Sequence, residues 1–416
     1  MRPGFKRTDV GLVPEQWDIR RIADFATVGS GGTPSRAVSA YWNGSIPWVT
    51  TSQVDFGVID SAEQFITTEG LRSSAAKLLP AGTLLMAMYG QGKTRGKVGV
   101  LGMPAATNQA CASITLHEGV SREFILHYLS GRYEDIRSSS NSGSQDNLSG
   151  HIVKQIPVAL PGLTEQRVIA AALSDMDALL AGLDRLIAKK HDLKQAAMQQ
   201  LLTGQTRLPG FQGEWELRRL GEHVSFLKNG AHSRAELAAN GPIKNLHYGD
   251  IHASGTVTLD PSSMPSLSND HARTLGRLTN GDLVFVDASE DLDGVGKSVE
   301  IVGTAGVQFV AGLHTIAARF DPAVLAHGFK AYLQFCPPFR LHLKRLAAGT
   351  KVYATNRRHI ASAEMRLPSV QEQAAIAAVL SDMDVELTTL VARRAKTRAL
   401  KQAMMQELLT GRTRLV

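Results

Sequence analysis

The sequence predicts an α+β fold: two mixed α/β domains joined by two long antiparallel coiled-coil helices, in a pseudo-two-fold, circular-repeat arrangement. Two segments of the chain are nearly duplicated and space their apolar residues as helices do, which predicts the long helices. The blocks before them alternate short β-rich runs with Gly, Pro, Ser and Asn turns, which is typical of α+β domains. The 416 residues, 43 % hydrophobic and 20 % charged, suffice for two or three domains folded throughout.

The duplication defines the order of the elements. Residues 160–208 and 367–415 align without gaps and are identical at 29 of 49 positions. Two near-identical helices in one chain usually pair about a pseudo-two-fold axis, so we expect an antiparallel pair. The predicted domains are a first head at 1–155, a central repeat helix at 156–208, a second head at 209–362 and a distal repeat helix at 363–416.

Each repeat helix has recognisable ends and an apolar seam. Apolar residues recur at alternating spacings of four and three, the pattern of a coiled coil. The predicted seam residues are Ile169, Leu173, Met176, Leu180 and Leu183, and Ile376, Leu380, Met383, Leu387 and Leu390. Each helix follows a proline (Pro161, Pro368), carries a glutamate in its first turn (Glu165, Glu372) and ends at a glycine (Gly204, Gly411). At 1.5 Å per residue, each would span about 57 Å.

The first head begins with residues that resemble those after the first repeat helix. WDIRRIADF from Trp17 is similar to WELRRLGEH from Trp215, and PGF at Pro3–Phe5 matches PGF at Pro209–Phe211. The second repeat helix therefore continues, in pattern, at the start of the chain. We expect the N-terminal segment to pack beside the C-terminal helix as residues 209–215 follow the central one.

The two heads differ from each other more than the helices do. The expected strands include IPWVT (46–50) and TLLMAMY (83–89) in the first head, and DLVFVD (282–287) and TIAARF (315–320) in the second. Apart from a few loop signals the heads align poorly. Two variable heads on one repeated frame are the expected architecture.

Charge and cysteine content indicate which partners and which cellular compartment the chain suits. The net charge of +7, from 45 basic and 38 acidic residues, permits a polyanionic partner without establishing one. Cys111 and Cys336 are expected to be buried, reduced thiols, which fits the cytoplasm. No run of about 18 apolar residues and no apolar N-terminal region occur, so we expect neither membrane spanning nor secretion.

Enzymatic signals are weak. Ala87–Thr94, AMYGQGKT, loosely fits a phosphate loop, but RGKVGVLGMP follows where a helix would have to begin, so strand or turn is expected. A nucleotide site in a DNA-dependent hydrolase is the weaker alternative. His247 and His252 flank Asp250, and acids cluster at 287–293, yet loop positions without metal are favoured for both groups. We predict no catalytic and no metal-binding residues.

Four loops combine small, amide and basic residues, at 29–36, 89–97, 141–147 and 350–358. Arg, Lys, Asn and Gln read base edges, while Ser, Thr and backbone N–H groups hold phosphates. A polar surface turn remains the alternative for any one loop. The predicted DNA-binding residues of the first head are Thr33, Ser35, Arg36, Gln91, Lys93, Arg95 and Gln145. Those of the second head are Lys228, Asn245, His247, Tyr248, Lys351, Tyr353 and Arg357. Two unlike heads on rigid helices predict an asymmetric, two-part DNA site.

The order head, LPxxxEQ helix ending LLTG, head, LPxxxEQ helix ending LLTG resembles the specificity subunit of type I restriction–modification systems. KRTDVGLVPEQW, GGTPSR, IPWVT, GKTRGKVGV with TNQA, and PGFQGEW also look like that family's sequences, and the resemblance covers essentially the whole chain. It implies a non-catalytic subunit whose two target-recognition domains read double-stranded DNA.

The resemblance also implies partners. Two modification subunits would bind S-adenosylmethionine and methylate adenine, and restriction subunits would use ATP and Mg. A scaffold whose heads grip protein instead of DNA is the remaining alternative.

Overall fold

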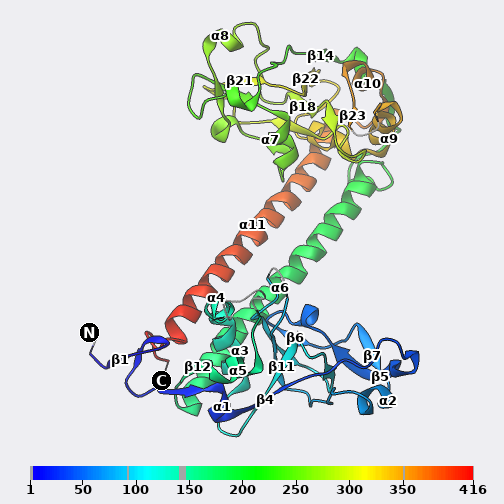
Figure 1. The fold of residues 1–416 in the computed structure, drawn as a ribbon. Coiled ribbons are helices and arrows are strands. Elements are labelled where there is room, and N and C mark those ends of the chain that lie inside the picture. The colour runs from blue at the N-terminus through cyan, green and yellow to red at the C-terminus, as the bar shows by residue number, and fades with distance from the viewer. Residues whose placement is uncertain (1–2, 91–92, 140–146, 350–351, 416) are drawn as a thin grey trace. The chain divides into compact units, whose positions relative to one another are not determined.

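A computed structural model describes residues 3–90, 93–139, 147–349 and 352–415. The chain divides into two compact units (Figure 1). Unit 1 consists of residues 1–184 and 393–416, and unit 2 of residues 185–392. Each unit therefore contains one head and a part of both long helices. The predicted fold class is confirmed, while the residue limits of the four domains stay a prediction.

The long helices are α6 (Leu163–Leu201) and α11 (Val370–Leu408), each of 39 residues. Ion pairs join them within each unit, and residue numbers rise along one helix as they fall along the other, so the pair is antiparallel as predicted. The pairs are Asp177–Lys401 and Asp184–Arg394 in unit 1, and Lys190–Glu386 and Lys194–Asp384 in unit 2.

The ten predicted seam residues are all buried or half-buried. Leu183 and Leu387, near the middle of each helix, are 4 % and 6 % exposed. Ile169 and Leu173 belong to the core of the first head, and Ile376 and Leu380 to the core of the second. The apolar stripe of each helix thus has two uses. Its N-terminal part packs into the core of a head, and its later part faces the other long helix.

Among the described residues, the first head has two larger sheets and two two-stranded ribbons, one of them formed by β1 and β2. A five-stranded sheet has the order β4-β11-β8-β9-β6, a three-stranded sheet the order β10-β5-β7, and β12 pairs with β3. The strands are β1 (Phe5–Thr8), β2 (Gly11–Pro14), β3 (Asp18–Arg21), β4 (Ala26–Ser30), β5 (Trp42–Val49), β6 (Val58–Ile59), β7 (Gln64–Ile66), β8 (Leu84–Ala87), β9 (Val98–Leu101), β10 (Ala106–Thr107), β11 (Cys111–Leu116) and β12 (Pro157–Leu160). The helices are α1 (Ile22–Phe25), α2 (Thr68–Arg72), α3 (Arg122–Gly131), α4 (Tyr133–Ser138) and α5 (Gly150–Gln155), with short 3-10 turns η1 (Ser39–Tyr41) and η2 (Thr51–Gln53).

The second head repeats this plan. Its sheets have the orders β14-β22-β18-β20-β16 and β17-β15-β21, β13 pairs with β24, and an extra pair joins β19 to β23. The strands are β13 (Glu216–Arg219), β14 (Val224–Phe226), β15 (Ile243–Leu246), β16 (Thr258–Leu259), β17 (Ser266–Leu267), β18 (Leu283–Val286), β19 (Ala288–Ser289), β20 (Ser298–Ile301), β21 (Gln308–Ala311), β22 (Thr315–Phe320), β23 (Tyr353–Ala354) and β24 (Glu364–Leu367). The helices are α7 (Tyr248–Ala253), α8 (Asn269–Ala272), α9 (Pro337–Leu346) and α10 (Arg357–Ala361), with 3-10 turns η3 (Leu220–Glu222), η4 (Arg234–Glu236), η5 (Pro261–Ser263) and η6 (Lys330–Phe335). The two heads share one topology although their sequences align poorly.

In unit 1 the N-terminal segment closes onto the end of α11. Arg414 pairs with the buried Glu165 through two nitrogens, its Nη2 lying 2.8 Å from Oε2, and Trp17 Nε1 donates to the same carboxylate over 3.2 Å. Gly411 has a φ of 67°, and a β-carbon there would lie 3.0 Å from the Trp17 ring. Only glycine fits this left-handed, crowded position at low cost.

Unit 2 contains the same junction. Arg207 donates to both oxygens of the buried Glu372 over 2.6 Å, and its guanidinium lies 5.9 Å from the centre of the Trp215 ring. Gly204 has a φ of 71° and faces the same ring. The N-terminal segment therefore packs against the end of α11 in the same way as the segment after α6 packs against the end of α6. The predicted circular repeat is confirmed.

Cys111 and Cys336 are free and buried, and burial raises the pKa of each thiol to about 12. Such thiols are unreactive, as the prediction of reduced core cysteines requires. Within the described residues, no helix combines the length and the apolar character needed to cross a membrane.

Candidate nucleic-acid interface

In the first head, Thr33, Ser35 and Arg36 lie in the exposed loop that follows β4. The Arg36 guanidinium lies 3.7 Å from the centre of the Trp42 ring, and its Nη2 donates to Gln64 Oε1 over 2.7 Å. Trp42 in turn donates through Nε1 to the Ser35 carbonyl over 3.1 Å. An arginine stacked and hydrogen-bonded in this way is held ready for a ligand, because little side-chain freedom remains to be lost.

Lys93 and Arg95 lie in the turn between β8 and β9. The Lys93 side chain is exposed, while its carbonyl accepts a 2.5 Å hydrogen bond from the Tyr133 hydroxyl. Arg95 is half-buried and donates to the Arg137 carbonyl over 3.3 Å. Because β9 begins at Val98, the AMYGQGKT segment leads from strand to strand, as predicted, and lacks the helix N-terminus of a phosphate loop. Gln91 and Gln145 lie outside the described residues.

In the second head, Lys228 and Arg357 come together at the loop after β14. Lys228 is exposed and donates to Thr274 Oγ1 over 3.1 Å. Arg357, at the start of α10, donates to the Leu227 carbonyl over 2.9 Å and to Asn229 Oδ1 over 3.1 Å. Tyr353 is half-buried in β23, and Lys351 lies outside the described residues.

The other three predicted residues of this head lie at different depths. Asn245, in the central strand β15, is fully buried, and His247 is 6 % exposed. Burial, followed by the charge of Arg234, lowers the pKa of His247. Tyr248 is half-buried, and the centre of its ring lies 4.6 Å from that of the His247 ring and 5.4 Å from that of the His314 ring. His247 thus packs against Tyr248, whereas Asn245 lies in the interior of the head, and DNA binding by either residue stays a prediction.

Two hollows flank Asp287, which directly follows β18. One, of about 500 Å³, is lined by Asn229, Thr315, Asn356 and Arg357 together with Asp287 itself. The other, of about 560 Å³, is lined by Tyr248, His252, Glu290, Asp291 and His314. Tyr248 and Arg357 were selected from the sequence, but Asp287 and His314 were not. The acidic run containing Asp287 was interpreted as a solvated loop, and no local motif marks His314.

A metal is not indicated at these histidines. Asp250 accepts from the backbone N–H of His247 over 2.9 Å and pairs with Arg234, so its carboxylate caps α7. Among the described residues there is no group of three or more His, Cys, Asp or Glu side chains placed to hold a metal ion.

Residues 14–189 match the family described as the type I restriction modification DNA specificity domain. The chain is 25 % identical over 264 residues to the MjaIX specificity subunit of Methanocaldococcus jannaschii, an alignment covering 59 % of this chain and 58 % of that protein. It is 23 % identical over 432 residues to the MjaVIII specificity subunit of the same organism, covering 99 % of this chain and 96 % of the relative. The crystal structure of the M. genitalium type I specificity subunit superposes with a TM-score of 0.60 at 13 % identity, covering 98 % of this chain and 99 % of that one.

Two heads of one topology, mounted on a pair of near-identical antiparallel helices, define the architecture of type I specificity subunits. Over nearly its whole length the chain is similar to type I restriction–modification specificity subunits, and residues 14–189 match the DNA specificity domain of that family. The relatives that it matches are specificity subunits of type I restriction enzymes.

Proposed function

We propose that this subunit selects the DNA sequence that its complex modifies, each head reading one half of an asymmetric site. One observation carries the proposal: the helices are identical at 29 of 49 positions, whereas the heads keep a common topology with divergent surfaces. A repeated frame with unlike heads is expected when each head must recognise a different sequence, because base readout depends on individual side chains.

The proposed DNA contacts are the predicted residues of both heads. In the first head these are Thr33, Ser35, Arg36, Lys93, Arg95, Gln91 and Gln145, the last two outside the described residues. In the second head they are Lys228, Tyr248, Tyr353, Arg357 and Lys351, the last outside the described residues, with Asn245 and His247 as supporting residues. Arg36 and Arg357 are the strongest candidates, because both are exposed and already held in place by neighbouring side chains.

The helices are proposed to fix the number of unread base pairs between the half-sites. Each is 39 residues long, about 58 Å at 1.5 Å per residue, and each runs from one unit into the other. Ion pairs and an apolar seam hold the pair in register within both units. We propose that this helix pair acts as the ruler between the half-sites.

Two modification subunits carrying S-adenosylmethionine are proposed to dock on the helical frame, and restriction subunits using ATP and Mg to complete the assembly. Several apolar side chains of the frame are exposed in unit 2, among them Leu186, Leu193 and Val385. Exposed apolar side chains on an ordered helix are typical of a protein–protein interface.

The test is methylome sequencing in a host without adenine methylation. The chain is expressed with the methyltransferase encoded beside it, and that methyltransferase is also expressed alone. Modified adenines should appear only with both proteins, in an asymmetric motif split by a fixed gap. An unsplit motif, or one that does not depend on this chain, contradicts the proposal and favours a scaffold.

A further inference from the structure

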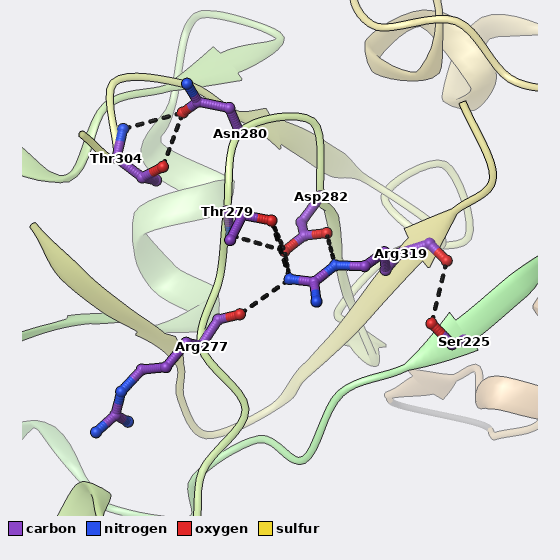
Figure 2. A network of polar contacts seen from close by, with 7 residues as sticks. All are labelled: Ser225, Arg277, Thr279, Asn280, Asp282, Thr304 and Arg319. Atoms are coloured by element: carbon purple, nitrogen blue, oxygen red, sulfur yellow. Dashed lines mark hydrogen bonds and ion pairs between the residues drawn. The ribbon is translucent and has the colours of Figure 1, made fainter. Parts of the chain in front are cut away.

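Strands β18 and β22 pair with each other, and an ion pair between Asp282 and Arg319, called the clamp below, fixes one end of the pairing. The strands pair antiparallel from Leu283 opposite Ala318 to Val286 opposite Thr315. Figure 2 shows the clamp before Leu283, where Arg319 donates to both oxygens of Asp282 over 2.8 and 2.7 Å. Asp282 is 1 % exposed, and its hydrogen bond raises the pKa of the Arg319 guanidinium.

The clamp extends to the loop that precedes β18. Arg319 Nη2 also donates to the Arg277 carbonyl over 3.0 Å and to Thr279 Oγ1 over 2.9 Å (Figure 2). The half-buried Arg319, which bonds the buried Asp282 through two nitrogens, ties β22 to the start of β18. The residues at the other end of the two strands, after Val286 and before Thr315, therefore extend from strands whose relative position is fixed.

Asp287 and His314 occupy that opposite end. His314 Nδ1 lies 3.1 Å from Asp287 Oδ1, and the Asp287 backbone N–H donates to the His314 carbonyl over 3.2 Å. His314 has a φ of 55°, an uncommon left-handed conformation for a residue other than glycine. Such strain persists where the surrounding structure imposes it, and it is concentrated at functional sites.

The pair is accessible. Half of the His314 side chain and about a third of that of Asp287 are exposed. The His314 ring stands nearly perpendicular to the Tyr248 ring and lines the hollow of about 560 Å³. Glu290 and Asp291 line the same hollow, so a phosphate would be repelled there. The edge of a base, which is uncharged, fits this lining.

The first head has the same backbone at this place with different chemistry. Its strands pair Ala87 with Cys111 as the second head pairs Val286 with Thr315. The Met88 backbone N–H donates to the Ala110 carbonyl, as Asp287 does to His314. Met88 and Ala110 thus stand where the second head has Asp287 and His314. The fold does not require the Asp287–His314 pair.

The carboxylate of Asp287 determines which ring nitrogen of His314 carries the proton and which one can accept a hydrogen bond. A carboxylate only accepts, so Nδ1 carries the proton that points at it, and a neutral imidazole then accepts through Nε2. In the major groove adenine and cytosine present amino groups as donors, whereas guanine and thymine present none.

We propose that His314 reads one base of the second half-site, its Nε2 accepting a hydrogen bond from the amino group of adenine or cytosine, with Asp287 as the positioning residue. The inference rests on the proposed function. It adds a specificity-determining pair to the residues already proposed for the second head. Tyr248 packs against the ring of His314 on the same hollow.

The test uses the co-expressed complex and the motif it methylates. His314→Gly removes the ring and suits the left-handed backbone, so the head should still fold. The expected result is relaxation at one base pair of one half-site, where discrimination against pairs whose amino group lies on the other strand falls about tenfold. The other half-site and the gap should not change. An unaltered motif, relaxation at several base pairs, or relaxation in the other half-site overturns the proposal.

Two further variants separate reading from folding. His327→Ala is the matched control: this exposed histidine of the same head also faces a carboxylate, with Nδ1 3.6 Å from Glu300 Oε1, but lies away from the hollow. It should leave the motif intact. Asp287→Ala should relax the same base pair only, and His314→Gly with Asp287→Ala no more than His314→Gly alone. Additive losses, or losses at several base pairs, contradict the positioning role. If the unmodified chain directs no split motif, the proposed function itself fails, whatever these variants do.

Discussion

Arg36 shows how one residue of the interface is prepared for a ligand. The Trp42 ring and Gln64 hold its guanidinium at an exposed position, so that contact with DNA costs little further ordering. The indole of Trp42 is itself fixed by the Ser35 carbonyl. Three neighbouring residues therefore share one task, which is to present a planar cation.

Replacing this cation gives a test at single-residue scale. Arg36→Ala should weaken binding of the complex to its duplex by about 1–3 kcal/mol and relax discrimination in the first half-site, if the side chain contacts a base. Fluorescence anisotropy with duplexes altered at single positions measures both effects. Arg72→Ala, which removes an exposed arginine at the end of α2, is the control and should change neither. Equal losses for both variants would show a general charge effect instead of a specific contact.

Residue types in loops could be predicted from the sequence, but their depth and their partners could not. Arg36 and Arg357 were selected for their chemistry and are exposed. Asn245 was selected for the same reason and is buried, because it lies in the central strand of a three-stranded sheet. His314 was missed because its partner Asp287 is 27 residues away, and only the pairing of β18 with β22 brings them together.

At the scale of elements, each head sits on its long helix through equivalent but chemically different contacts. In unit 1, the buried His127 of α3 lies 3.1 Å from Ser174 Oγ and 3.9 Å from Asp177 of α6. In unit 2, the Tyr332 hydroxyl donates to Asp384 of α11 over 3.0 Å. Burial, followed by the charge of Lys401, lowers the pKa of His127 to about 4. Only the first head therefore has an acid-sensitive contact at this position.

The stability of unit 1 should therefore fall in mild acid. An unfolded histidine has a pKa near 6.5, so between pH 6.5 and pH 4 the unfolded state binds more protons, and the free energy of unfolding falls as pH falls. His127 should contribute a loss of about 2 kcal/mol between pH 7 and pH 5. Urea unfolding at the two pH values measures it. His127→Tyr, which copies unit 2, should reduce the loss by that amount; an unchanged pH dependence would exclude His127 as its source.

The junction at the start of the chain gives a second test of the elements. Glu165→Gln leaves Arg414 half-buried without its counter-charge and should lower the free energy of unfolding by about 3 kcal/mol. Glu386→Gln breaks the exposed pair with Lys190 on the helices and should cost less than about 1 kcal/mol. Denaturant unfolding of both variants gives the comparison. Equal costs would show that the junction adds nothing beyond an ordinary surface ion pair.

The elements themselves were largely predictable. Duplication and apolar spacing indicated both long helices, and TIAARF at 315–320 coincides with β22. The similar segments at Trp17 and Trp215 indicated a common plan for the two halves, but the strand order of the heads could not be predicted, because backbone hydrogen bonds tolerate unrelated side chains. Poor alignment between the heads concealed it.

At the scale of the whole molecule, the two units are two copies of one design. The Arg414–Glu165 and Arg207–Glu372 junctions repeat each other, and each closes a head onto the frame of its own unit. Both long helices cross from one unit to the other, between Asp184 and Arg185 and between Ala392 and Arg393. Length added at these two points leaves the contacts inside each unit intact.

The most direct measurement is therefore the methylated motif of a variant with one extra heptad inserted at both crossing points. Seven residues add about 10 Å and preserve the seven-residue apolar repeat. We predict unchanged half-sites separated by a gap about three base pairs longer, at 3.4 Å per base pair. A folded variant that keeps the original gap, or that methylates different half-sites, would contradict the claim that the heads read DNA while the helices set the distance between its two parts.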